Sequence, residues 1–352
     1  MPKWIGNRFG NAVPVNPGGE GPSAVYSMFD QYYMRQEGGW VTPVSMSGGT
    51  AFGPVTIDGA ERMVCRFRSP GTFTLTDGNA PSARILVVGG GGAGGSFNPG
   101  AYGGGGGGAG GVRYVPSISL TAGTYPISVG DGGTGGNPWG SPKDGGTPAQ
   151  PKGGGTSSIF NPGDGNSVPA ITATGGGAGG ISGGIGGSGG SGGGASYPGP
   201  HNASGDAGGL EPRANPTSEG NPSETLKSGT GSRYHCGGGG GAGASSPTPW
   251  QNGASGITLS GVGSPSDPWL PPAGNVFGGG GGGSSYKETD GNGSGGPGGG
   301  GDAPGGDGTE YTGGGGGGIG SPNGVGGDGG FGVVYVIIPK AEVGEANPGP
   351  GS

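Results

Sequence analysis

The chain has 352 residues, of which 107 are glycine and 34 are proline, and its formal net charge is −7. Glycine and proline together exceed the roughly 25–30% that usually indicates a low-complexity chain. The acidic balance, without any basic cluster, argues against a nucleic-acid partner. No apolar stretch approaches the roughly 20 residues of a transmembrane helix, and the first residues lack the apolar core of a signal peptide. We therefore expect neither membrane insertion nor nucleic-acid binding.

Residues 1–45 are predicted to form a docking arm with one short helix. Between Pro22 and Gly38, apolar side chains recur at the spacing of a single helix face. A helix of about 14 residues is marginal on its own, so it must pack either within the chain or on another subunit. Both destinations remain open. The candidate docking residues are Trp4, Phe9, Val25, Met28, Phe29, Tyr32, Tyr33 and Trp40.

Residues 46–130 are rich in β-branched and aromatic residues and predict short strands. Phe73 and Leu75 alternate with threonine, as in a strand with one buried face. Asp77-Gly78 predicts a turn, and Pro126 predicts an edge position or a bulge. The predicted strands are Met63–Phe67, Gly71–Leu75, Ile85–Val88, which lacks alternation and is expected at the centre of the sheet, Val112–Leu120 and Thr124–Val129.

Glycine dominates an excursion at 89–111 and the long segment 131–330. It forms uninterrupted blocks such as Gly103–Gly108 and Gly278–Gly283. Between Gly183 and Gly194 a residue other than glycine, here called a guest residue, falls at every third position. A period of three is that of a polyproline II-type helix, whose backbone groups must bond to neighbouring chains. The alternatives are a packed bundle of polyglycine II helices and a disordered tract. The low charge and the aromatic residues favour the bundle.

Phe331–Pro339 is the most strand-like segment of the chain. Such an apolar strand needs partners, and the early strands are the only sheet predicted. We therefore expect one β-sandwich built from 46–130 and 331–340, closed across an inserted bundle at 131–330 and followed by a tail at 341–352.

The order of these strands and glycine blocks resembles the glycine-rich domain of bacteriophage tail-fibre and other virion proteins. The resemblance covers about residues 60–339 and implies a small jelly-roll-like β-sandwich carrying inserted polyglycine II helices, usually in a homotrimer. The segments that carry it are Gly71–Thr74, Arg84–Gly95, Gly107–Val112, Gly123–Gly133 and Gly326–Ile338.

The docking arm at residues 1–45, which we also call the leader, resembles the first segment of phage structural proteins, especially those of phages that infect marine bacteria and cyanobacteria. Trp4–Gly10, Ala24–Tyr33 and Gly38–Trp40 carry this second resemblance. No trimeric coiled coil or β-helical shaft is recognisable between leader and glycine domain. A short fibre, a tip adhesin and a decoration protein therefore all remain open.

Residues of catalytic or metal-binding type are few. The only histidines are His201 and His235, and His235 stands beside Cys236, where adjacent side chains usually diverge. Cys65 and Cys236 lack metal-ligand spacing, and two free buried thiols are favoured over a disulfide. The aspartates of the glycine region form no calcium-binding loop pattern. We predict no catalytic residue, no metal and no cofactor.

Connectors between glycine blocks place aromatic residues beside proline or small polar residues, a composition suited to stacking on sugars or apolar receptor surfaces. The candidates for receptor binding are Trp139, Tyr197, Trp250, Trp269 and Tyr286. For Trp250 and Trp269 the alternative is that they pack against the ends of the bundle.

The predicted function is that of a non-enzymatic phage structural protein at the virion surface, a tail fibre or adhesin that attaches to the host. The expected partners are other virion proteins through 1–45, a host receptor or glycan, and further copies of the chain. The alternatives are a capsid decoration or head-fibre protein, and an ice-binding or matrix-type polyglycine II protein.

Overall fold

The computed structural model describes residues 45–96, 103–136, 151–159, 170–181, 183–196, 220–223, 235–244, 251–285, 291–321 and 324–340. This part of the chain is mainly β-structure, with one 3-10 helix, η1, at Ser260–Val262. The predicted docking helix and the eight docking candidates of the arm lie outside the described residues.

The strands form an eight-stranded antiparallel sheet and a separate two-stranded hairpin. The hairpin pairs β8 (Ile257–Thr258) with β9 (Val276–Phe277). The eighth strand of the large sheet, β1 (Ser45–Ser47), pairs with β4 outside the linear order of the other seven. The order in the large sheet is β2 (Thr50–Ile57), β3 (Ala60–Phe67), β10 (Val333–Pro339), β4 (Gly71–Val88), β5 (Val112–Ser128), β6 (Ser157–Ile159) and β7 (Ile171–Ala173).

The last strand closes the sheet across the glycine region, as the sequence predicts. β10 lies between β3 and β4, and Val336 is paired with Cys65 on one side and with Ile85 on the other. The glycine-rich excursion at 89–111 joins the neighbouring strands β4 and β5, whereas the long glycine-rich region returns the chain to the sheet beside β4. The prediction that Ile85–Val88 is a central, fully buried strand is also confirmed.

Two predictions about strand boundaries are wrong: the turn at Asp77-Gly78, and the division of one strand into Val112–Leu120 and Thr124–Val129. No turn interrupts the chain at Asp77-Gly78, because β4 runs from Gly71 to Val88 and β5 runs beside it from Val112 to Ser128. Register shifts between Leu75 and Asn79, and again near Ala83, absorb the irregular residues. Bulges of this kind bend a strand without ending it. The edge strand β2 was not predicted from the sequence. The register of its pairing with β3 shifts between Phe52 and Val55, around Gly53-Pro54.

Both faces of the central strands are buried. Along β10, Val334, Val336 and Ile338 enter one core cluster together with Phe73 and Tyr125. The alternate residues of β10, Val333, Tyr335 and Ile337, enter a second cluster that also contains Trp269 and Phe277. The second cluster lies between the sheet and the segment that joins β8 to β9. A strand covered on both faces has no polar alternation, which explains the apolar run of β10.

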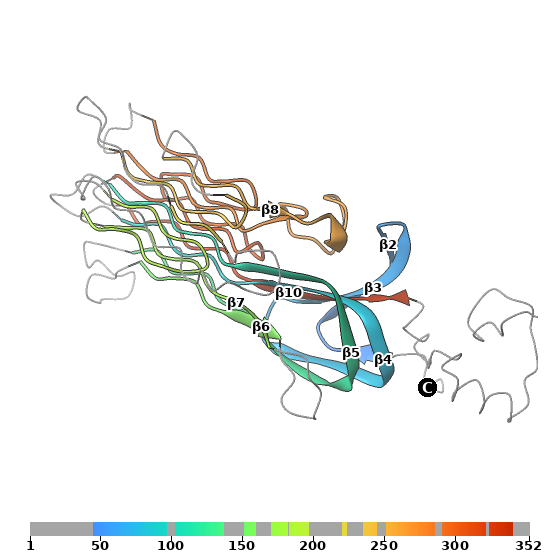
Figure 1. Ribbon diagram of the computed structural model, residues 1–352. Coiled ribbons are helices and arrows are strands. Elements are labelled where there is room, and N and C mark those ends of the chain that lie inside the picture. Colours follow the sequence, from blue (N-terminus) through green and yellow to red (C-terminus); the bar gives the residue numbers. More distant parts are fainter. Residues whose placement is uncertain are drawn as a thin grey trace, which may run out of the picture.

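The glycine segments run side by side away from the sheet (Figure 1). Their backbone hydrogen bonds follow a repeat of three residues, which residues 89–95 show most clearly. Gly89, Gly92 and Gly95 donate to Gly111, Gly108 and Gly105 of one neighbour; Gly90 and Ala93 donate to Gly155 and Lys152 of a second; Gly91 and Gly94 donate to Gly330 and Gly327 of a third.

The carbonyls of the same segment accept from three further neighbours. Gly176 and Gly179 of one neighbour donate to two of these carbonyls, Gly316 and Ile319 of a second neighbour donate to two others, and Gly133 of a third neighbour donates to one. The segment therefore has six hydrogen-bonded neighbours. Residues 103–111 are surrounded in the same way. The buried backbone groups of this region are satisfied between segments that are distant in the sequence.

Glycine is required because the backbones approach too closely for a side chain. A Cβ added to Gly91 would lie 1.9 Å from the carbonyl oxygen of Gly314, and one added to Gly107 would lie 2.1 Å from that of Gly92. Real Cβ atoms do not reach these distances. The close spacing explains why guest residues are confined to particular positions.

Candidate functional site

Several glycine segments end, and the connectors that follow them begin, at the same cross-section of the bundle. Ser284 N donates to Gly104 O, Cys236 N donates to Ser284 O, and Gly237 N donates to Ala195 O. These residues come from four segments that are separated by connectors in the sequence. Their hydrogen bonds place the four segments next to one another at this level of the bundle.

Four of the five receptor-binding candidates, Trp139, Tyr197, Trp250 and Tyr286, lie outside the described residues. The chain neighbours of three of them are described, and they lie around the same cross-section. Ser285, which precedes Tyr286, forms a β-bridge with His235. Gln251, which follows Trp250, contacts His235 through its amide and accepts a hydrogen bond from Gly283 N. Ser196, which precedes Tyr197, follows Ala195 directly in the chain.

His235 contacts the side-chain amide of Gln251. Its Nδ1 faces Nε2 of Gln251, and the side chains of Cys236 and Ser284 converge beside Gly103, where an added Cβ would lie 2.9 Å from Sγ and 2.8 Å from Oγ. An amide orients an imidazole but does not stabilise its protonated form as the carboxylate of a catalytic triad does. Within the described residues no group of three or more histidine, cysteine, aspartate or glutamate side chains could hold a metal ion.

Cys65 and Cys236 are both buried and form no disulfide, as the sequence favours. The thiol of Cys65 donates to Gly48 O, and burial raises its pKa from 9.0 to about 12. The thiolate is the reactive form, so Cys65 is expected to resist alkylation in the folded protein.

We predict that iodoacetamide at pH 8 labels Cys65 and Cys236 only after denaturation, which mass spectrometry of the tryptic peptides measures. The raised pKa adds a pH dependence of stability. The unfolded thiol ionises near pH 9, whereas the folded thiol does so near pH 12, so the contribution of Cys65 is complete below pH 9 and falls as the pH rises toward 12. Rapid labelling of Cys65 in the native protein would contradict this prediction.

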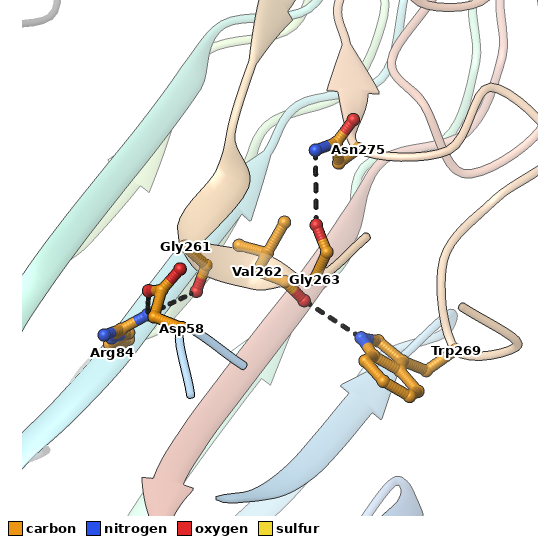
Figure 2. Close-up of polar contacts among 7 residues, drawn as sticks. All are labelled: Asp58, Arg84, Gly261, Val262, Gly263, Trp269 and Asn275. Carbon is orange, nitrogen blue, oxygen red and sulfur yellow. Dashed lines mark hydrogen bonds and ion pairs between the residues drawn. The ribbon is translucent and has the colours of Figure 1, made fainter. Parts of the chain in front are cut away.

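The fifth candidate, Trp269, is buried, with 4% of its surface exposed. Its indole Nε1 donates to Val262 O at 2.9 Å (Figure 2). Its own carbonyl accepts from Tyr335 Oη and from the guanidinium of Arg66. A side chain held in this way offers little surface to a receptor, which favours the alternative that Trp269 has a packing role.

The segment around Trp269 is also fastened to the sheet by Arg84, and Asn275 adds a hydrogen bond within the segment itself. Arg84 of β4 donates to Asp58 Oδ2 at 2.6 Å and to Gly261 O at 2.9 Å, and Asn275 Nδ2 donates to Gly263 O (Figure 2). The segment thus covers one face of the sheet and joins it to the bundle. The Arg84–Asp58 pair is partly exposed, so its own contribution to stability is small, about 0–1 kcal/mol.

A row of three stacked side chains lies where the sheet meets the glycine segments. The guanidinium of Arg68 lies 4.3 Å from the ring centroid of Tyr311. The ring of Tyr311 stacks on that of Phe331, with centroids 6.0 Å apart and planes inclined by 26°. We call Arg68, Tyr311 and Phe331 the aromatic row. The sequence did not predict it because its members come from three separate segments; the two arginines at positions 66 and 68 were the available signal.

Comparison with known families is consistent with this architecture. The profile of a family described as a glycine-rich domain matches residues 68–339, which is most of the chain. The chain belongs to this family. The match begins just after β3 and ends at the last residue of β10, so the glycine-rich domain comprises most of the sheet together with the glycine segments. A comparison with curated proteins gives no match. The part of the glycine-rich domain described by the structure contains no helix able to cross a membrane.

Proposed function

We propose that this glycine-rich domain protein is a bacteriophage structural protein at the virion surface, a tail fibre or adhesin that attaches the particle to its host. It acts without catalysis: residues 1–45 dock on other virion proteins, and aromatic connectors bind a host receptor or glycan. The observation that carries the proposal is the cross-section that brings together the chain neighbours of Tyr197, Trp250 and Tyr286.

We infer further that the glycine segments are polyglycine II helices inserted into a small jelly-roll-like sandwich. The three-residue repeat of hydrogen bonds and the six neighbours of residues 89–95 support this assignment. Such helices rise by about 3.1 Å per residue, so a six-glycine block is a spacer of roughly 19 Å. A scaffold of this kind would hold binding loops at a fixed distance from the particle.

A capsid decoration or head-fibre protein is the second candidate, since it would use the same leader at another place on the particle. An ice-binding or matrix protein is the third, and it would need a flat face of regularly spaced small polar residues. The guests between the glycine blocks are irregular, which favours the first two. Association into a homotrimer belongs to the same proposal.

The experiment is a cell-binding assay with the full chain. The protein is labelled with a fluorophore and incubated with a panel of marine bacteria and cyanobacteria, and bound fluorescence is measured by flow cytometry. We expect binding to some strains, and a loss of about tenfold or more in the triple variant Tyr197→Ser, Trp250→Ser, Tyr286→Ser. Val325→Ser, which removes an exposed apolar side chain of the bundle, is the matched control and is expected to bind normally.

Two results would count against attachment. The triple variant could bind cells as well as the unmodified chain does, which would show that these aromatic connectors do not bind the receptor. Alternatively, no strain is bound, and gold-labelled antibodies decorate only the heads of purified particles, which would favour the decoration protein.

A further inference from the structure

The aromatic row leaves part of the Phe331 side chain exposed to solvent. Phe331 is 38% exposed, and it is one of three large apolar side chains exposed to this degree among the described residues. Arg68 is also exposed, while Tyr311 between them is half-buried. A guanidinium and an aromatic ring are therefore presented together at the junction of β3, the glycine segments and β10.

The backbone holds Tyr311 in this place at some cost. Its φ is 63°, in the left-handed region that a tyrosine rarely adopts. The surrounding turn is well fastened: Thr312 Oγ1 donates to Thr309 O and accepts from Gly314 N, and Gly313 N donates to Phe331 O. These bonds tie the turn to the segment that carries Phe331. The ring is thus preorganised rather than free to collapse on the surface.

Two arginines lie near the aromatic row, although the whole chain is acidic and the exposed Glu310 directly precedes Tyr311. Arg66, which is 9% exposed, donates to Trp269 O and lies over the ring of Phe52, while its Nε has no hydrogen-bond partner among the described residues. Burial lowers the pKa of Arg66, and the neighbouring charge of Arg68 lowers it further. Arg68 forms no ion pair within the described part of the chain. Two cationic groups thus lie together, and the outer one is accessible.

We propose that the aromatic row binds an acidic saccharide, with a sugar ring stacked on Phe331 and a carboxylate or sulfate held by Arg68. Aromatic faces pack against the C–H groups of sugar rings, and the planar guanidinium pairs with both of these anions. A ligand of two or more sugar units reaches both groups, because Arg68 and Phe331 lie 4.3 and 6.0 Å from the ring centroid of Tyr311.

Other anionic ligands fit less well. Nucleic-acid binding depends on neutralising several phosphates, whereas Arg68 is the only exposed arginine of the aromatic row and the net charge of −7 opposes a polyanion. An acidic peptide would use Arg68 but would leave the face of Phe331 without a ring to stack on. The proposal is independent of attachment through the connectors and applies equally to a decoration protein.

The test is isothermal titration of the full chain with a trisaccharide of galacturonic acid and, separately, with the neutral trisaccharide of galactose. We expect the acidic sugar to bind, the neutral one to bind about tenfold more weakly or not at all, and binding of the acidic sugar to weaken as salt is raised. Arg68→Gln is expected to weaken binding of the acidic sugar by about tenfold, and Phe331→Ser by about fivefold.

Matched variants separate binding from folding. Lys340→Gln removes one positive charge at an exposed ion pair with Glu61 and is expected to leave affinity unchanged. Tyr311→Asn removes the central ring but keeps a residue that tolerates the left-handed region, and Arg68→Lys keeps the charge without the planar group. Both are expected to weaken binding, and Arg68→Lys is expected to do so while the thermal unfolding of the protein stays close to that of the unmodified chain.

Several outcomes would overturn the proposal. They are equal binding of the acidic and neutral trisaccharides, no binding of either, full retention of affinity in Arg68→Gln, or displacement by oligoglutamate at the same concentration as by the sugar. The last result would identify an acidic-peptide site. None of these outcomes bears on the cell-binding assay, whose variants lie in the connectors.

Discussion

Replacing Gly91 with alanine is expected to destabilise the folded protein by about 3 kcal/mol or more, at the upper end of the cost of overpacking. The added Cβ would lie 1.9 Å from Gly314 O and 2.4 Å from its carbonyl carbon. Relief by movement is blocked, because Gly91 N donates to Gly330 O and Gly91 O accepts from Gly133 N, so both neighbours must move with it. Urea unfolding followed by circular dichroism measures the loss.

Gly123→Ala provides the control for this experiment. A Cβ at Gly123 would have its nearest contacts at 3.9 Å and 4.0 Å, which is ordinary van der Waals distance. We expect a change of no more than about 0.5 kcal/mol, or a slight stabilisation through the lower entropy of the unfolded chain. If Gly91→Ala were as stable as Gly123→Ala, the close packing of the glycine segments would be refuted. Equal, large losses in both would instead indicate a general intolerance of alanine.

Trp269→Ala is expected to cost about 3–5 kcal/mol, the range for removing a large aromatic side chain from a core. The indole packs in the cluster with Tyr335 and Phe277, and its removal also leaves Val262 O without its donor. Thermal unfolding and urea titration measure the loss. Trp269→Phe keeps much of the packing and loses the hydrogen bond, so it should cost about 1–2 kcal/mol.

The same variants decide between the two roles considered for Trp269. If it packs the core, the folded fraction of Trp269→Phe binds cells as the unmodified protein does. A variant that is fully stable but no longer binds cells would restore Trp269 as a receptor-binding residue.

The local sequence pattern predicted the secondary structure correctly where the tertiary packing agrees with it. The apolar run of β10 predicted a strand that needs partners in the early sheet, and the structure places it between β3 and β4. The local pattern predicted the structure wrongly where contacts between residues distant in the sequence override it. Asp77-Gly78 has the composition of a turn, yet pairing with β5 on the neighbouring strand carries β4 through it. Trp269 stands between Pro268 and Leu270 in a connector and resembles an exposed loop residue, but Tyr335 and the sheet cover it.

The candidate sites divide in the same way. Aromatic connectors are visible in the sequence because composition alone marks them. The aromatic row is not, because Arg68, Tyr311 and Phe331 meet only when the end of β3, a turn of the glycine region and the start of β10 are brought together.

The sequence by itself determined that these glycine segments can pack at backbone distance, because a residue without a Cβ is the only one that fits, and that the strands surrounding them are apolar enough to form a sheet. Only the tertiary structure decided which glycine segment lies beside which. Uninterrupted glycine blocks are interchangeable as sequences, so they carry no information about their partners. The strands at their ends and the guest residues between them fix the neighbours, and the three-residue hydrogen-bond repeat then follows along each segment.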